Sequence, residues 1–309
     1  RKRLFKRLEA PLLNLQARAR TRDLQKVITL LAEADSQLGG DVLLNSQDVW
    51  TMLVRMYNTS MGNNSFLDYF WSWRALMGGL YSMLLADIPE ADCYHALCTG
   101  FAGLLLARTK LETEKPCVLT EHGIYTNERR IEISGADWLE DPRSLNLNVE
   151  RDRFEKSLRD LWIEAFAGYS NLCYDACDKI ITLYEGNTEL QLEDGADPDK
   201  LSVIPNGIDF EQYSTIQPIE DTPPTVALIG RVVPIKDVKT FIRAAGMLQQ
   251  SVENLRAWII GPTDEDAEYH AECLEMVEHS GLQKTVTFTG KVKIDEYLEQ
   301  IDVIVLTSL

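Results

Sequence analysis

The sequence has little that would suit a membrane-spanning or exported protein. No apolar run approaches the roughly 18 residues that a membrane-spanning helix needs. The basic start RKRLFKRLEAPLL lacks the longer apolar core and the cleavage site of a signal peptide. None of the six cysteines stands in a C-x-x-C pair, which favours buried, reduced thiols over disulfides or a zinc site. These absences predict a protein of the reducing cytoplasm.

Positive charge is also scarce. The chain carries 31 Lys and Arg residues against 48 Asp and Glu residues, a net charge of −17. An acidic chain repels phosphate backbones, so we expect no binding to nucleic acid through a bulk field. The exception is residues 1–26, where nine Lys or Arg residues accompany two acidic residues. The leucines Leu4, Leu8, Leu12 and Leu15 repeat there at helical spacing. This predicts either a surface helix packed by its leucine stripe or a contact with a membrane surface.

The distribution of apolar residues predicts a helical region followed by parallel sheets. Residues 1–85 are rich in Leu and Ala and show no strand-like alternation. Short apolar runs follow, with helical segments between most of them, including a long one at 151–177; the runs are ADCYHAL, KPCVLTEHG, DKIITLYEG, KLSVIPNGID, TVALIG, LRAWIIG, TVTFTG and IDVIVLTSL. This alternation is typical of parallel sheets with helices on both faces. Because a polar turn lies at 193–201, we expect an α/β protein of two facing Rossmann-like domains, 1–200 and 201–309. Ligands of such sheets bind beyond the carboxyl ends of the strands, so two facing sheets would form a cleft.

The stretch ALIGRVVPIKDVKTF, residues 227–241, joins a strand end to two cations. Gly230 ends the apolar run, Arg231 and Lys236 follow, and the apolar residues after them repeat at helical spacing. A helix N-terminus carries free N–H groups and partial positive charge, so with two added cations this arrangement suits a diphosphate. Chemistry alone does not decide between that site and two surface cations paired with acids such as Asp237. The fingerprint G-x-G-x-x-G does not occur in this stretch, which argues against a nicotinamide-dependent dehydrogenase.

The same stretch resembles the donor-diphosphate site of glycosyltransferase family 4, in which G-R-x-x-x-x-K lies between a strand and a helix. The segments KIITLYEGN, VIPNGID, RAWIIGPTDED and VTFTGKV are similar to neighbouring segments of that family, in order. DYFWSWRAL, YHALCTGFAGLLLA, LTEHGIYTNERRIEI, RDLW and LCYDAC resemble the Pel exopolysaccharide glycosyltransferases, a subgroup of the family. The resemblance covers nearly the whole chain and is weakest before residue 60. It implies a fold of the GT-B type, with two Rossmann-like domains.

The resemblance also implies roles for individual residues. Arg231 and Lys236 would hold the diphosphate of a nucleotide sugar beside Gly230. His122 would lie beside the donor sugar as the catalytic candidate, and His95 matches a neighbouring strand-end histidine, for which a satisfied core histidine is the alternative. The residues flanking the nucleotide base would be Gly261, Gly290, Lys291 and Val292, and those near sugar, phosphate or acceptor would be Glu121, Tyr125, Arg129 and Arg130. For the two adjacent arginines a solvated charge run is the competing interpretation.

A metal site is not expected. Two D-x-D pairs are present, Asp197 with Asp199 and Asp264 with Asp266. The first pair lies in the boundary turn, and the second lies at a family position that is not a metal site. We therefore expect no metal and no cofactor, because the two cations of the diphosphate site supply the positive charge that a metal would bring.

The activity that the resemblance implies is a retaining transfer of glucose or a related hexose from UDP-glucose to a growing exopolysaccharide. The implied location is the cytoplasm, at the inner face of the membrane, with a membrane polysaccharide synthase complex as partner. The alternative is a non-catalytic subunit for nucleotide-sugar binding or assembly.

Two parts of the family pattern are missing from the sequence. The Gly-rich loop after a first strand is not found before the helical region, and the carboxylate pair E-x7-E would come after Leu309. We therefore expect both domains to be incomplete, and little or no transferase activity from this chain alone.

Overall fold

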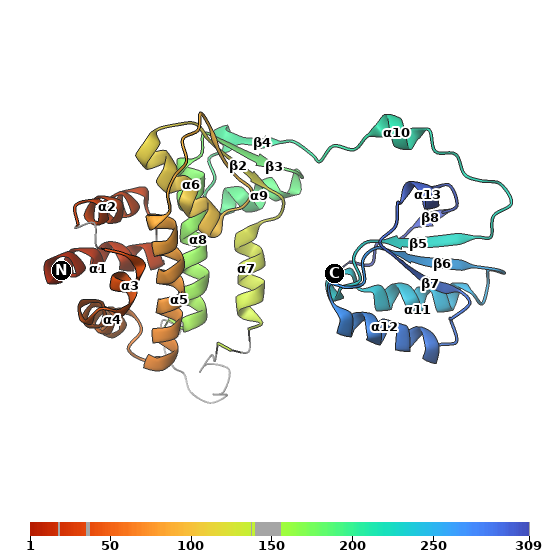
Figure 1. The fold of residues 1–309 in the computed structure, drawn as a ribbon, viewed down its shortest axis with the longest axis horizontal. Coiled ribbons are helices and arrows are strands. Elements are labelled where there is room, and N and C mark those ends of the chain that lie inside the picture. The colour runs from red at the N-terminus through yellow and green to blue at the C-terminus, as the bar shows by residue number, and fades with distance from the viewer. Residues whose placement is uncertain (18, 35–37, 137, 140–155, 309) are drawn as a thin grey trace. The chain divides into compact units, whose positions relative to one another are not determined.

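The computed structural model divides the chain into two compact units, Arg1–Asn206 and Gly207–Leu309 (Figure 1). The residues that it describes are 1–17, 19–34, 38–136, 138–139 and 156–308. Each unit contains a four-stranded sheet, and every strand pairing in the two sheets is parallel. The α/β class predicted from the alternation of apolar runs is therefore confirmed.

The first unit begins with a helical region, which confirms the expectation for residues 1–85. Its helices are α1 (Lys2–Ala17), α2 (Thr21–Ala32), α3 (Gly40–Asn45), α4 (Gln47–Ser60) and α5 (Phe66–Leu85). Apolar residues at helical spacing, such as Leu8 and Leu12 in α1, face a shared core and are fully buried. In α5 the same spacing buries Trp73 and leaves Trp71 exposed. Burial of each such large side chain contributes about 1.5–3 kcal/mol, so core packing holds these helices together.

The sheet of the first unit has the strand order β1-β2-β3-β4. The strands are β1 (Tyr94–Ala96), β2 (Cys117–Glu121), β3 (Lys179–Thr182) and β4 (Leu201–Val203). The helices between them are α6 (Gly100–Thr113), α7 (Tyr125–Ser134), α8 (Leu158–Ala176) and α9 (Gly186–Glu193), with a 3-10 turn at Pro198–Lys200. Alternate strand residues, among them Leu119 and Ile180, pack against Leu106 of α6 and Tyr174 of α8. The helix expected at 151–177 is α8, whose capping box at Ser157 precedes Leu158; residues 151–155 lie outside the described residues.

Strand β4 belongs to the first sheet. Ile180, Ile181 and Thr182 of β3 pair in register with Leu201, Ser202 and Val203. A domain boundary between residues 200 and 201 would separate β4 from its hydrogen-bonded partner, and the two units of the structure divide after Asn206.

The sheet of the second unit has the order β7-β6-β5-β8. Its elements are α10 (Phe210–Ser214), β5 (Thr225–Ile229), a 3-10 turn at Pro234–Lys236, α11 (Val238–Leu248), β6 (Arg256–Ile260), α12 (Ala267–His279), β7 (Val286–Gly290), α13 (Asp295–Leu298) and β8 (Val303–Ile304). Phe241 and Ile242 of α11 are buried in one cluster with Ala257 and Ile259 of β6 and Cys273 of α12. Because this core includes both helices and the central strands, it holds the carboxyl ends of β5 and β6 side by side.

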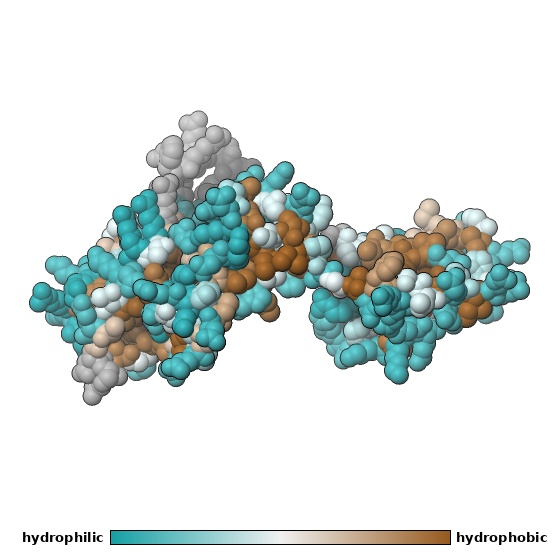
Figure 2. Space-filling model, turned by 90° about the horizontal axis from the view of Figure 1, so that it is seen from above, coloured by the Kyte–Doolittle hydropathy of each residue, from teal (hydrophilic) through white to brown (hydrophobic). Residues whose placement is uncertain are grey.

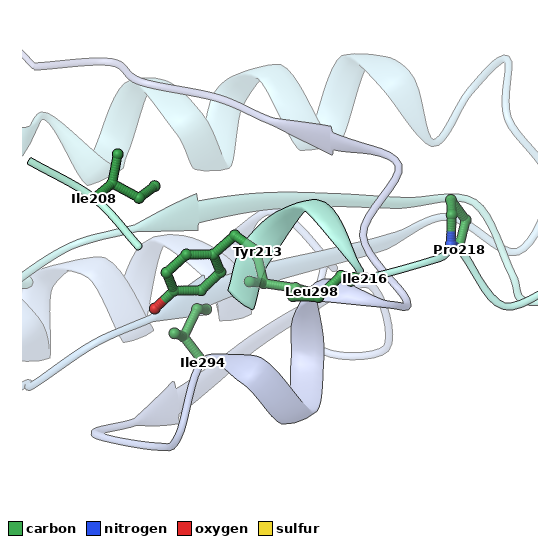
Figure 3. Close-up of a pocket in the computed structure, with 6 residues that line it drawn as sticks. All are labelled: Ile208, Tyr213, Ile216, Pro218, Ile294 and Leu298. Atoms are coloured by element: carbon green, nitrogen blue, oxygen red, sulfur yellow. The ribbon is translucent and has the colours of Figure 1, made fainter. Parts of the chain in front are cut away.

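The second unit also has an open apolar pocket of about 500 Å³ (Figure 3). It is lined by Ile208, Tyr213, Ile216, Pro218, Ile294 and Leu298. Hydrogen bonds from Gln212 Nε2 to Asp295 Oδ2 (3.0 Å) and from Ile219 N to Glu299 O (2.8 Å) tie the segment around α10 to α13. Figure 2 shows hydrophobic surface on this unit. None of the site residues predicted from the sequence lines this pocket.

Candidate functional site

Three glycines lie side by side where the strands of the second sheet end. Gly230 follows β5, Gly261 follows β6 and Gly290 ends β7. The N–H of Gly230 donates to the carbonyl of Ile260 (2.9 Å), and the N–H of Gly261 donates to the carbonyl of Gly290 (3.1 Å). Gly261 has φ +153, and a Cβ added there would lie 2.1 Å from the carbonyl oxygen of Gly230. The close approach of these two backbones therefore requires glycine at 261.

Lys236 lies directly over the first of these glycines. A Cβ added to Gly230 would be 3.8 Å from Cδ and Cε of Lys236, so the lysine stem covers the strand end. Its carbonyl oxygen accepts a hydrogen bond from Thr307 Oγ1 (2.8 Å), which ties the 3-10 turn to the chain after β8. Within the described parts of the chain, Lys236 forms no ion pair. Its charge is therefore available to an anion at the strand ends.

Arg231 is paired with an acid that the sequence reasoning did not single out. Its Nη1 forms an ion pair with Oε1 of Glu265, and the two side chains are 53% and 48% exposed. Asp237, the acid considered for this role, instead caps α11, because its Oδ1 accepts from the N–H of Thr240 (3.3 Å). An exposed ion pair contributes about 0–1 kcal/mol, so an incoming phosphate can displace the glutamate at little cost.

The other predicted base-side residues follow β7. Gly290 has φ +69, which turns the chain out of the strand. Lys291 after it is exposed and Val292 is half-buried. Their contact with a nucleotide base stays a prediction.

Glu121 ends β2 and is buried, with 1% of its surface exposed. Its Oε2 accepts from the hydroxyl of Tyr174 (2.8 Å) and from Nε2 of Gln191 (2.8 Å), and its Oε1 accepts from Oγ1 of Thr99 (3.4 Å). The backbone N–H of Tyr125 donates to the same carboxylate. Burial raises the pKa of Glu121, and these hydrogen bonds partly offset the rise.

Through these hydrogen bonds Glu121 holds the neighbouring helices in place at the end of β2. Its donors come from the N-cap of α6, the start of α7, α8 and α9, so one carboxylate ties four elements to the end of β2. Sequence reasoning missed Thr99, Tyr174 and Gln191 as partners. Two of them lie in segments that carry the resemblance, Thr99 in YHALCTGFAGLLLA and Tyr174 in LCYDAC, but that resemblance gave neither a role as a partner of Glu121.

The two histidines belong to neighbouring parts of the first sheet: His95 lies in β1, and His122 follows the end of β2. His122 directly follows Glu121 and is exposed. His95, in β1, is also exposed, and its Nε2 lies 2.8 Å from Oγ1 of Thr120 in β2. Because its side chain is exposed, His95 is not the buried core histidine that was considered as the alternative. A catalytic or sugar-binding role for either histidine stays a prediction.

The remaining predicted residues lie on α7. Tyr125 packs edge-on against Phe166 of α8 (5.9 Å between ring centroids), and burial raises its pKa. The guanidinium of Arg129 lies 5.1 Å from the centre of the Tyr125 ring and pairs with Glu132 (2.7 Å). Arg130 is exposed, and its Nη2 donates to Oδ1 of Asn127 (2.5 Å). Both arginines are thus engaged within their own helix.

The two D-x-D pairs contain capping residues. Asp197 caps the 3-10 turn by accepting from the N–H of Asp199 (3.0 Å). Asp266 caps α12 by accepting from the N–H of Tyr269 (2.9 Å). Among the residues described, no group of three or more His, Cys, Asp or Glu side chains is arranged to hold a metal. No helix in the described ranges is long and apolar enough to cross a membrane.

Two family models match the chain. Residues 2–199 match the model described as "Domain of unknown function (DUF3492)", and residues 209–309 match "Glycosyl transferases group 1". No curated protein matches the sequence.

Solved structures similar to the chain include two complexes of HepE from Anabaena. The complex with UDP is 16% identical with a TM-score of 0.51, over 87% of this chain and 69% of that one. The complex with UDP and glucose is 16% identical with a TM-score of 0.47, over 77% and 56%. The lipopolysaccharide outer core galactosyltransferase WaaB, in its apo form, is 14% identical with a TM-score of 0.44, over 79% and 57%. The chain thus spans 56% to 69% of the length of these structures. It shares the GT-B type of fold with the HepE complex with UDP.

Proposed function

Because the chain belongs to the family described as Domain of unknown function (DUF3492) and continues into a glycosyl transferases group 1 region, we propose that it is a glycosyltransferase that uses a UDP-sugar. The observation that carries this proposal is the cluster at the carboxyl ends of β5, β6 and β7. Three adjacent strand-end glycines let a ligand approach the backbone, and Arg231 and Lys236 stand at the same edge. Ligands of open parallel sheets bind at this edge.

In the proposed complex the diphosphate lies against Gly230, beneath Lys236, which forms no ion pair among the residues that the structure describes. Arg231 exchanges the carboxylate of Glu265 for a phosphate oxygen. The loops that begin at Gly261 and Gly290 border the nucleotide base.

The reaction that we propose breaks the bond between the anomeric carbon of the sugar and the β-phosphate oxygen. An acceptor hydroxyl oxygen forms the new bond to that carbon from the same face, and its proton passes to the departing phosphate. This front-face displacement retains the configuration. Arg231 and Lys236 stabilise the charge that develops on the leaving UDP, which is electrostatic work without a metal. His122 and His95 hydrogen-bond sugar hydroxyls in this scheme.

The finer assignment rests on the resemblance to the Pel exopolysaccharide glycosyltransferases. The donor is UDP-glucose, the transferred group is glucose or a related hexose, and the acceptor is a growing exopolysaccharide. The protein works in the cytoplasm at the inner face of the membrane, with a polysaccharide synthase complex as partner. The second candidate is a non-catalytic nucleotide-sugar-binding subunit. It would use the same strand-end glycines and the same two cations, because binding a diphosphate needs no further group.

Calorimetric titration with UDP and UDP-glucose tests the donor site through Arg231→Ala and Lys236→Ala. A hydrogen bond to a charged group contributes about 1.5–3 kcal/mol, so each variant should lose about 10- to 100-fold in affinity. The loss should be larger for Lys236, because Arg231 must first leave Glu265. Arg243→Ala removes an exposed cation from the same unit and should leave the affinity unchanged. Unchanged affinity in both site variants would remove the diphosphate assignment.

Release of UDP from UDP-glucose, measured with a polysaccharide acceptor, separates the two candidate functions. A transferase consumes the donor, whereas a binding subunit holds it without turnover.

A further inference from the structure

One side of helix α1 concentrates positive charge in an otherwise acidic chain. Lys2, Arg3, Lys6 and Arg7 are all exposed, and their spacing places them on the same side of the helix. The opposite side, which includes the fully buried Leu8, packs into the helical core. Arg1 precedes the helix, and Arg7 is paired with Glu33, so we call Arg1, Lys2, Arg3 and Lys6 the basic face. In Figure 2 the end of the first unit that carries α1 is largely hydrophilic.

The charges of the basic face are not neutralised within the described part of the chain. Arg7 next to them forms an ion pair with Glu33 (3.2 Å between Nη1 and Oε2). Glu9, the acid of α1, is engaged by Arg55 at 2.6 Å. No member of the basic face itself has an ion pair among the described residues. Among the described residues, Glu9 and Glu33 are therefore already paired, and the four cations of the basic face have no acidic partner there.

A hollow of about 230 Å³ lies beside the basic face, where α1 meets the end of α2. Arg1, Arg3 and Arg7 line it together with the buried Leu30 and with Glu33. A hollow with several guanidinium groups at its rim suits the phosphate of a lipid headgroup.

We propose that the basic face docks the protein on an anionic lipid bilayer. The net charge of −17 does not prevent this, because charges beyond about 8 Å are screened at physiological salt and a membrane interacts with the nearest face. The basic face contains no aromatic residue, so it fits a bilayer surface better than single-stranded nucleic acid, which is bound on aromatic stacking platforms. Phe5, the aromatic residue of α1, is buried, so the contact is electrostatic adsorption rather than insertion.

Sedimentation with vesicles tests this inference without requiring transferase activity. The probes are vesicles of phosphatidylcholine with about 30 mol% phosphatidylglycerol, a content that gives a negative surface potential, and vesicles of phosphatidylcholine alone. The test variant is the triple substitution Lys2→Gln, Arg3→Gln and Lys6→Gln. The control is Lys115→Gln, Lys284→Gln and Lys293→Gln, which removes the same charge from exposed lysines elsewhere. Circular dichroism verifies that both variants are folded.

We expect binding to the anionic vesicles, little binding to the neutral ones, and dissociation as salt rises from about 0.1 M to about 1 M. Each cation near an anionic surface accounts for about fivefold in partitioning, so the test variant should bind about 100-fold more weakly. The control should bind like the wild type. Equal binding to both kinds of vesicle, equal losses in the two variants, or no binding at all would overturn the proposal. Tighter binding to a single-stranded oligonucleotide than to the anionic vesicles, lost in the test variant, would assign the basic face to nucleic acid instead.

Discussion

The ion pair between Arg231 and Glu265 leads to a specific prediction. Removing the negative charge of Glu265 should tighten the binding of UDP at the proposed site. In the free protein the carboxylate of Glu265 occupies the guanidinium that we assign to the diphosphate. Glu265→Gln leaves Arg231 free before the ligand arrives. It also removes a negative charge from the neighbourhood of the incoming phosphates.

The magnitude follows from the exposure of the two side chains. Both are about half exposed, so the pair is well screened and contributes about 0–1 kcal/mol. A carboxylate about 6 Å from a phosphate charge in water adds a repulsion of about 0.7 kcal/mol, and less once the freed Glu265 turns away. The two effects together amount to about 1 kcal/mol, which corresponds to about fivefold tighter binding of UDP.

Calorimetric titration with UDP at low and high salt measures this change. Glu268→Gln is the matched control, because it removes the charge of another exposed acid near the start of α12. In an Arg231→Ala background the gain from Glu265→Gln should shrink to the repulsion alone. High salt should reduce the gain in every background. If Glu265→Gln binds UDP as the wild type does, or more weakly, Arg231 does not exchange a carboxylate for a phosphate.

Three further predictions concern the network at the end of β2 and the glycines of the second unit. Tyr174→Phe removes a hydrogen bond to the buried carboxylate of Glu121, so urea unfolding should show a loss of about 1.5–3 kcal/mol; wild-type stability would contradict the network. Burial raises the pKa of Glu121 above its ordinary value of 4.5. The stability that protonated Glu121 contributes is therefore fully present below pH 4.5 and is lost as the pH rises through the raised pKa. Glu121→Gln should abolish this pH dependence of the free energy of unfolding. Gly261→Ala would place a Cβ 2.1 Å from the carbonyl of Gly230 and should destabilise the second unit by more than about 2 kcal/mol. Gly281→Ala, which also has a positive φ but open space around it, should cost only about 1–2 kcal/mol, and equal costs in thermal unfolding would refute the close approach.

Much of the fold could be predicted from local pattern. Each of the eight apolar runs contains a strand of the structure, and the helical region before them is present. The apolar spacing after Lys236 matches α11, whose Val238, Phe241 and Ile242 are buried. Such features depend on the period of the backbone, which the order of residues expresses directly.

Local sequence pattern could not predict hydrogen bonds and ion pairs between residues that lie far apart in the sequence. Glu121 meets Tyr174 and Gln191 across more than fifty residues, and Arg231 meets Glu265 across 34. The pairing of β4 with β3 likewise depends on a hydrogen-bonded register rather than on the composition of β4.

The sequence by itself thus determined the α/β class, the strands and the position of Gly230, Arg231 and Lys236 between a strand and a helix. Only the tertiary structure decided which of these charges are paired. Lys236 lies over a glycine and has no ion pair among the described residues, while Arg231 is held by Glu265, although the two cations look alike in the sequence. The reason is physical: the strength and availability of a charge depend on the atoms that surround it in space, and those come from other segments of the chain.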